Sequence, residues 1–119
     1  ISVSEGRILV SERIYFEYDR DTIRNVSAPV LDELAKVLRG LEPGTKVVVE
    51  GHTDDSGNAD YNLDLSHRRA RAVVEYLRAR GVPSERLDFI GLGSARPLAP
   101  SDTPEGRDLN RRVEFRLVR

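Results

Sequence analysis

Apolar side chains recur every three or four residues in two parts of this chain and predict two helices. Between residues 30 and 41 they are separated by three or four positions, as the buried stripe of a helix requires: Val30, Leu31, Leu34, Val37, Leu38 and Leu41. Ser27 and Pro29 suit the start of this helix, and Gly40 its end. A second helix is expected from about Asp60 to Arg80, because Gly81 follows it as a stop signal.

Shorter apolar or alternating runs predict the strands. We expect two short strands before the first helix, a buried β-branched strand after it, a further strand after the second helix, and an alternating, half-exposed strand at a sheet edge: Arg7–Val10, Arg13–Phe16, Lys46–Glu50, Arg86–Ile90 and Arg112–Arg119. Polar loops are expected at residues 51–58 and, with three prolines and three glycines, at residues 91–110. The order of elements predicts an α+β fold of β-α-β-α-β-β type, with helices on one face of a mixed sheet.

Composition limits the chain to one ordinary domain, residues 1–119. A net charge of −1 argues against a nucleic-acid partner, which usually requires a basic excess. The chain has no cysteine, so thiol catalysis and thiolate metal sites are excluded. No apolar run approaches the roughly 20 residues that cross a bilayer, so membrane attachment would need segments outside this chain. Because no signal-peptide pattern opens the sequence, we expect the C-terminal part of a longer protein.

One arginine of the second predicted helix falls on its apolar side. At about 100° per residue, Arg69 lies between Leu65 and Val73, whereas Arg68 falls at the polar edge. A buried guanidinium is costly without an anion, so Arg69 is expected to be largely buried beside a carboxylate, with Arg68 exposed. Asp54 is the best candidate, because it follows the carboxyl end of the buried strand. Two interpretations stay open: the two residues pair to fix the loop, or they bracket a pocket for a ligand with both charges.

These residues belong to a longer pattern. Residues 49–54 read Val-Glu-Gly-His-Thr-Asp and are followed by Gly57, Tyr61-Asn62, Leu65-Ser66 and Arg69-Ala70. This resembles the central signature of the OmpA-like domain, which is found in outer-membrane protein A, peptidoglycan-associated lipoproteins and the flagellar stator protein MotB. Phe16-Glu17-Tyr18-Asp19 resembles the early element of that family, and residues 105–107 and 110–114 resemble its closing motif. The resemblance covers residues 13–118.

The resemblance implies a β-α-β-α-β-β sandwich that binds peptidoglycan without cutting it. The implied ligand is the diaminopimelate of the peptide stem, with Asp54 binding its ammonium and Arg69 its carboxylate. The other implied or candidate contacts are Tyr18, Asp19, Ser56, Asn58, Asn62 and Leu65. Ser56 and Asn58 depart from the residues that the lipoprotein branch often carries there. The implied location is the periplasm, attached to the outer membrane or envelope of a Gram-negative bacterium, and no cofactor is implied.

Three other functions compete with this interpretation. A peptidoglycan hydrolase would need two acids around the cleaved bond, one with a raised pKa, whereas an arginine beside Asp54 would lower its pKa. A metal site at His52, Asp54 and His67 is disfavoured, since His67 falls on the solvated helix arc. A protein-interaction domain remains the main alternative, because the end of the chain is locally basic: Arg107, Arg111, Arg112, Arg116 and Arg119.

Overall fold

A computed structural model describes residues 1–10 and 12–118. The strands are β1 (Ser2–Ser4), β2 (Arg7–Leu9), β3 (Lys46–His52), β4 (Leu87–Gly93) and β5 (Arg112–Val118). The helices are α1 (Ala28–Arg39), α2 (Ala59–Ala79) and α3 (Pro104–Asn110), with single 3₁₀ turns at Asn25–Ser27 and Ser84–Arg86. No helix within these described residues has the length and apolar content that a membrane span needs.

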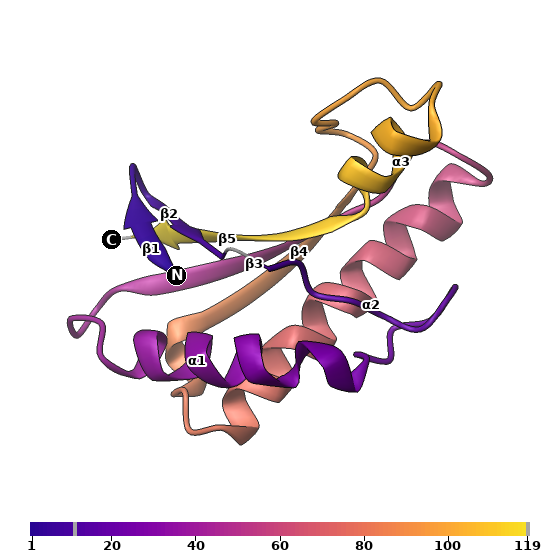
Figure 1. The fold of residues 1–119 in the computed structure, drawn as a ribbon. Helices are drawn as coiled ribbons and strands as arrows, with labels where there is room; N and C mark the ends of the chain where they lie inside the picture. Colours follow the sequence, from indigo (N-terminus) through magenta and orange to yellow (C-terminus); the bar gives the residue numbers. More distant parts are fainter. Residues whose placement is uncertain (11, 119) are drawn as a thin grey trace.

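The five strands form one mixed sheet in the order β1-β2-β5-β3-β4. Only β3 and β4 are parallel, and the remaining pairs are antiparallel. Helices α1 and α2 lie together against one face of this sheet, as Figure 1 shows. The predicted α+β class, with helices on one face of a mixed sheet, is therefore confirmed.

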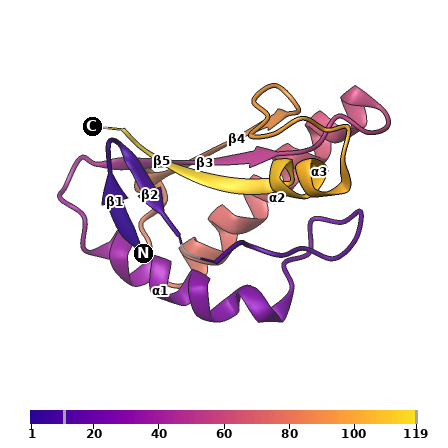
Figure 2. The ribbon, with the colours of Figure 1, turned by 45° about the horizontal axis from the view of Figure 1, so that its top comes forward.

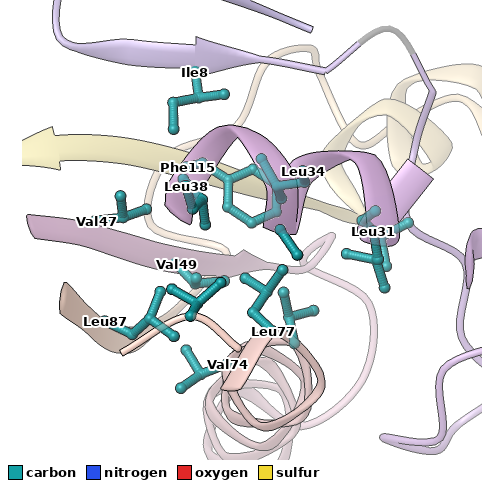
Figure 3. Close-up of a cluster of buried hydrophobic side chains, with 14 of the residues drawn as sticks. Ile8, Leu31, Leu34, Leu38, Val47, Val49, Val74, Leu77, Leu87 and Phe115 are labelled. Carbon is teal, nitrogen blue, oxygen red and sulfur yellow. The ribbon is translucent and has the colours of Figure 1, made fainter. Parts of the chain in front are cut away.

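The core fills the layer between this sheet face and the two helices. Figure 3 shows the strands contributing Ile8, Val47, Val49, Leu87 and Phe115, and the helices contributing Leu31, Leu34, Leu38, Val74 and Leu77. The three- and four-residue spacing read in the sequence places the α1 side chains here, and burial of these apolar areas is the main stabilising contribution. The predicted helices and the strands at residues 46–50 and 86–90 are thus confirmed within one to three residues.

The strand predicted at Arg13–Phe16 is wrong. This segment forms only an isolated bridge, between Phe16 and Ile23. The backbone N–H of Tyr15 donates to Ser27 Oγ, and its carbonyl accepts from the Arg24 N–H. Because these backbone groups are satisfied outside the sheet, the segment does not pair as a strand, and the loop that continues it contacts Arg69 of α2.

Two features near the C-terminus also differ from prediction. Residues 104–110 form helix α3, where only a loop was expected; the Thr103 hydroxyl accepts from the Gly106 N–H, and Pro104 occupies a position where proline costs no hydrogen bond. Strand β5 is not at an edge but between β2 and β3. Its alternating pattern arises because one sheet face packs on the helices while the other carries charged side chains. Arg119, the last residue of the predicted strand, lies outside the described residues.

Candidate functional site

Two glycines allow the close approach of α2 to the sheet that positions the site. Gly51 and Gly91 are paired across β3 and β4. A Cβ on Gly51 would lie 2.1 Å from the Ser66 carbonyl oxygen, and one on Gly91 would lie 2.3 Å from the His67 nitrogen. Only glycine permits this contact between backbones. Ser66 tightens it, since its hydroxyl accepts from the Gly93 N–H at 3.0 Å and donates to the Leu63 carbonyl.

A cleft of about 510 Å³ opens at this end of the molecule. Its walls come from the loop before α1, the loop after β3, helix α2, and α3 with Arg111, which follows it. Figure 2 shows α3 and the start of α2 at the opposite end of the sheet from the β1–β2 hairpin. Seven of the eight predicted contact residues line the cleft: Tyr18, Asp19, Asp54, Ser56, Asn62, Leu65 and Arg69.

Asn58, the eighth, is not among the residues that line the cleft. Its side chain accepts a hydrogen bond from the Tyr61 N–H at 2.9 Å and so caps the start of α2. The structure therefore gives Asn58 a local role in starting the helix that carries Leu65 and Arg69.

Asp54 is buried and held from two sides. Its Oδ1 accepts the Ser56 N–H at 2.8 Å, and its Oδ2 pairs with the Arg111 guanidinium at 2.5 Å. Burial disfavours the charged carboxylate, but these hydrogen bonds outweigh it and hold the Asp54 pKa below its usual value. Asp54 is therefore an anion at neutral pH.

Of the two interpretations of Arg69 and Asp54, the direct ion pair between them is wrong. Both side chains line the same cleft, but the ion-pair partner of Asp54 is Arg111. The Arg69 Nε donates to the Arg20 carbonyl at 2.8 Å, a terminal nitrogen lies 3.4 Å from the Glu17 carbonyl, and the guanidinium stacks 5.0 Å from the centre of the Phe16 ring.

Arg69 has no carboxylate within ion-pairing distance among the residues that the structure describes. Burial is the main reason why its pKa is lowered. Arg69 and Arg68 are both partly exposed, so Arg69 is less buried than expected, while Arg68, with 35% of its side chain exposed, lies close to the expected exposed state. They differ in their partners instead, since Arg68 pairs with Asp64 and Asp21 away from the cleft.

The rim of the cleft is built by the loop before α1. Tyr18 is 94% exposed, and Asp19 adopts a left-handed backbone conformation with φ of 57°. Asp19 accepts a hydrogen bond from the Tyr61 hydroxyl at 2.6 Å. This contact and the two carbonyl contacts of Arg69 join the loop to α2.

Sequence reasoning missed the wall formed by α3 and by Arg111, which follows it. Arg107, Asp108 and Arg111 line the cleft, together with Arg13 from the opposite loop. A signal for Arg111 existed, because it directly precedes a strand that pairs antiparallel with β3. In that register His52 lies opposite Arg112, which brings Arg111 beside the loop that carries Asp54.

The open face of the sheet carries a separate charged network. Glu50, only 2% exposed, pairs with Arg7 and Arg116, and Glu114 pairs with Arg7 and Arg112. Three arginines of the basic C-terminal segment, Arg111, Arg112 and Arg116, thus have internal carboxylate partners. His52 lies beside this network rather than in the cleft, with its Nε2 3.7 Å from Glu50 Oε1, and His67 is exposed on α2.

Comparison with known proteins identifies the family. The model of the OmpA family matches residues 15–111. The chain belongs to the OmpA family. Over 94% of its length, this OmpA-family chain is 41% identical to the peptidoglycan-associated lipoprotein of Pseudomonas aeruginosa, of which it covers 66%. It is 40% identical over 86% of its length to the peptidoglycan-binding protein ArfA of Mycobacterium tuberculosis, of which it covers 31%.

The fold agrees with that membership. The crystal structure of the peptidoglycan-associated lipoprotein from Burkholderia pseudomallei superposes with a TM-score of 0.80 at 28% identity, over 91% of this chain and 92% of that one. The chain spans about two thirds or less of the curated relatives named above.

Proposed function

We propose that this domain binds peptidoglycan non-covalently, through the diaminopimelate of the peptide stem, and anchors an envelope protein to the cell wall. The observation that carries the proposal is a cleft holding both a buried carboxylate, Asp54, and an arginine without a carboxylate partner among the described residues, Arg69. The free end of diaminopimelate carries an ammonium and a carboxylate. The names of the relatives, a peptidoglycan-associated lipoprotein and a peptidoglycan-binding protein, support the wall as the ligand.

Asp54 would bind the ligand ammonium. A carboxylate offers about four acceptor positions, and the Ser56 N–H and Arg111 use two of them. The remaining positions are left for a ligand that enters the cleft, which Asp54 lines. Because Arg111 and Ser56 already hold the carboxylate in place, little side-chain entropy is lost when the ammonium binds.

Arg69 would bind the ligand carboxylate. The Phe16 ring and two backbone carbonyls orient its guanidinium without neutralising it. A planar guanidinium can donate two parallel hydrogen bonds to a carboxylate, and such charge-assisted bonds are the strong ones in proteins. The partial burial that lowers the Arg69 pKa also favours an anion beside it.

The same geometry favours binding over hydrolysis. A glycosidase acid needs a raised pKa so that it is protonated before the bond breaks. The Asp54 pKa is shifted in the opposite direction. We therefore propose a non-catalytic domain located at the wall of a Gram-negative envelope.

The test compares stem peptides by isothermal titration calorimetry. A peptide with diaminopimelate should bind, whereas its lysine analogue, which keeps the ammonium but lacks the carboxylate, should bind roughly 30-fold or more weakly. Sites built around a polar group reject analogues that lack it, because their own group is left unpaired. Equal affinity for the two peptides would refute the role of Arg69, and no binding to either would refute the proposed function.

Matched variants separate the site from its surroundings. Asp54→Asn should abolish sedimentation with isolated sacculi, whereas Asp55→Asn, at the exposed neighbouring carboxylate, should not. Arg69→Gln should abolish it too, whereas Arg71→Gln, on the solvent side of α2, should not. Circular dichroism must show that each variant is folded. A folded Asp54→Asn domain that still sediments with the wall would place the binding site elsewhere.

A further inference from the structure

Arg107 is a second arginine of the cleft without a carboxylate partner among residues 1–10 and 12–118. It is half-buried on α3, and its guanidinium donates to the Ser101 carbonyl at 3.1 Å. Its helix is firmly placed, because a Cβ on Gly106 would lie 1.8 Å from the Pro100 carbonyl oxygen. Arg107 thus lines the cleft from a closely packed helix.

A zwitterion alone would not neutralise the charged side chains that line the cleft. Four arginines line it, Arg13, Arg69, Arg107 and Arg111, against three aspartates, Asp19, Asp54 and Asp108. Asp108 pairs with Arg13 and Arg111, and Asp54 pairs with Arg111. The free end of diaminopimelate has no net charge, so its binding leaves one positive charge in excess.

The cleft is also larger than the free end of the diaminopimelate side chain needs. Its volume of about 510 Å³ lies within the usual range for drug-sized ligands, roughly 300–1,000 Å³. Neighbouring residues of the peptide stem therefore have room beside α3. Besides the diaminopimelate carboxylate, a stem tetrapeptide has two free carboxylates: the α-carboxylate of D-glutamate and the C-terminal carboxylate of D-alanine.

We propose that Arg107 forms a second carboxylate-binding subsite, which reads a main-chain carboxylate of the stem peptide beyond the diaminopimelate side chain. This rests on the proposed function and adds a specificity determinant to it. The bound carboxylate supplies the negative charge that the cleft lacks. It also supplies the ionic partner that Arg107 does not have within the described part of the chain.

The experiment is a calorimetric cycle with the domain and its Arg107→Gln variant. Four ligands are used: the diaminopimelate tetrapeptide, the same peptide with D-glutamate amidated, the same peptide with its C-terminus amidated, and the lysine analogue. Arg107→Gln should weaken binding of the first peptide by about 10- to 100-fold, the loss expected for one charge-assisted contact. Arg71→Gln, the same change on the solvent side of α2, should leave its affinity unchanged.

The amidated peptides identify which carboxylate Arg107 binds. One of the two amidated peptides should bind the parent domain more weakly than the unmodified peptide, by a similar factor. The same amidation should not weaken binding to Arg107→Gln any further. The subsite would be overturned if amidation weakened binding equally in the parent and in Arg107→Gln, or if Arg107→Gln bound the unmodified peptide as tightly as the parent does. Either result would leave the diaminopimelate site intact. A parent domain that does not discriminate diaminopimelate from lysine would instead overturn the proposed function. If Arg107→Gln fails to fold, Arg107→Lys, which keeps the charge but loses the planar fork, should show a smaller loss with the same dependence on amidation.

Discussion

Asn110 holds together the wall of the cleft that carries Arg107 and Arg111. Its side chain is fully buried. The Oδ1 atom accepts from the Leu98 N–H at 2.7 Å and the Ala99 N–H at 3.1 Å. The Nδ2 group donates to the Ala99 carbonyl at 2.8 Å and to Ser101 Oγ at 2.9 Å. We predict that Asn110→Ala both destabilises the domain and weakens ligand binding.

The magnitude follows from these four hydrogen bonds. Each contributes about 0.5–1.5 kcal/mol, and water can reach some of the partners that the substitution frees, so a loss of roughly 2–4 kcal/mol is expected. This is a large part of the 5–15 kcal/mol typical of a small domain. At roughly 4 °C per kcal/mol, the Tm should fall by about 8–16 °C.

Urea unfolding measures this loss of stability, and Asn58→Ala is the variant with which it is compared. Asn58 makes one capping hydrogen bond, to the Tyr61 N–H, and removing such a cap costs about 1 kcal/mol. In Asn110→Ala the amides of Leu98 and Ala99 should also exchange hydrogen faster than in the parent. The reasoning is refuted if Asn110→Ala costs no more than Asn58→Ala and both amides keep their protection.

Two further predictions concern the sheet. Burial, aided by the nearby Arg112, lowers the His52 pKa below 6.5 against the opposing Glu114 and Glu50. Protons therefore bind the unfolded chain more readily, and the unfolding free energy should fall below pH 6.5 by up to about 1.4 kcal/mol per pH unit. His52→Gln should remove this slope between pH 7.5 and 5.5, and His67→Gln, at the exposed histidine, should retain it; an unchanged slope in His52→Gln would contradict the assignment. Gly91→Ala should cost at least 1–3 kcal/mol in urea unfolding, since its Cβ would meet backbone and side-chain atoms of His67 and Ser66 within 2.6 Å. Gly40→Ala, whose Cβ would have ordinary contacts, should be nearly neutral, and equal stability of the two variants would show that α2 can shift freely.

Local sequence determined the elements whose signals are local. The spacing of apolar residues placed α1 and α2, because a helix buries one stripe whatever its partner. The β-branched run of residues 46–50 indicated a central strand for a similar reason. The polar loop after that strand and the inward arc of α2 also placed Asp54 and Arg69 on one cleft.

Tertiary structure decided which charges meet. The alternating pattern of β5 is the same for an edge strand and for a central strand with one open face, so the pattern could not place β5 beside β3. Only that antiparallel pairing, with His52 opposite Arg112, brings Arg111 to Asp54 and leaves Arg69 without a carboxylate partner in the described structure. Helix α3 depends likewise on distant contacts, because a seven-residue helix is too short to be stable alone and is held by Asn110 and by the packing of Gly106 on Pro100.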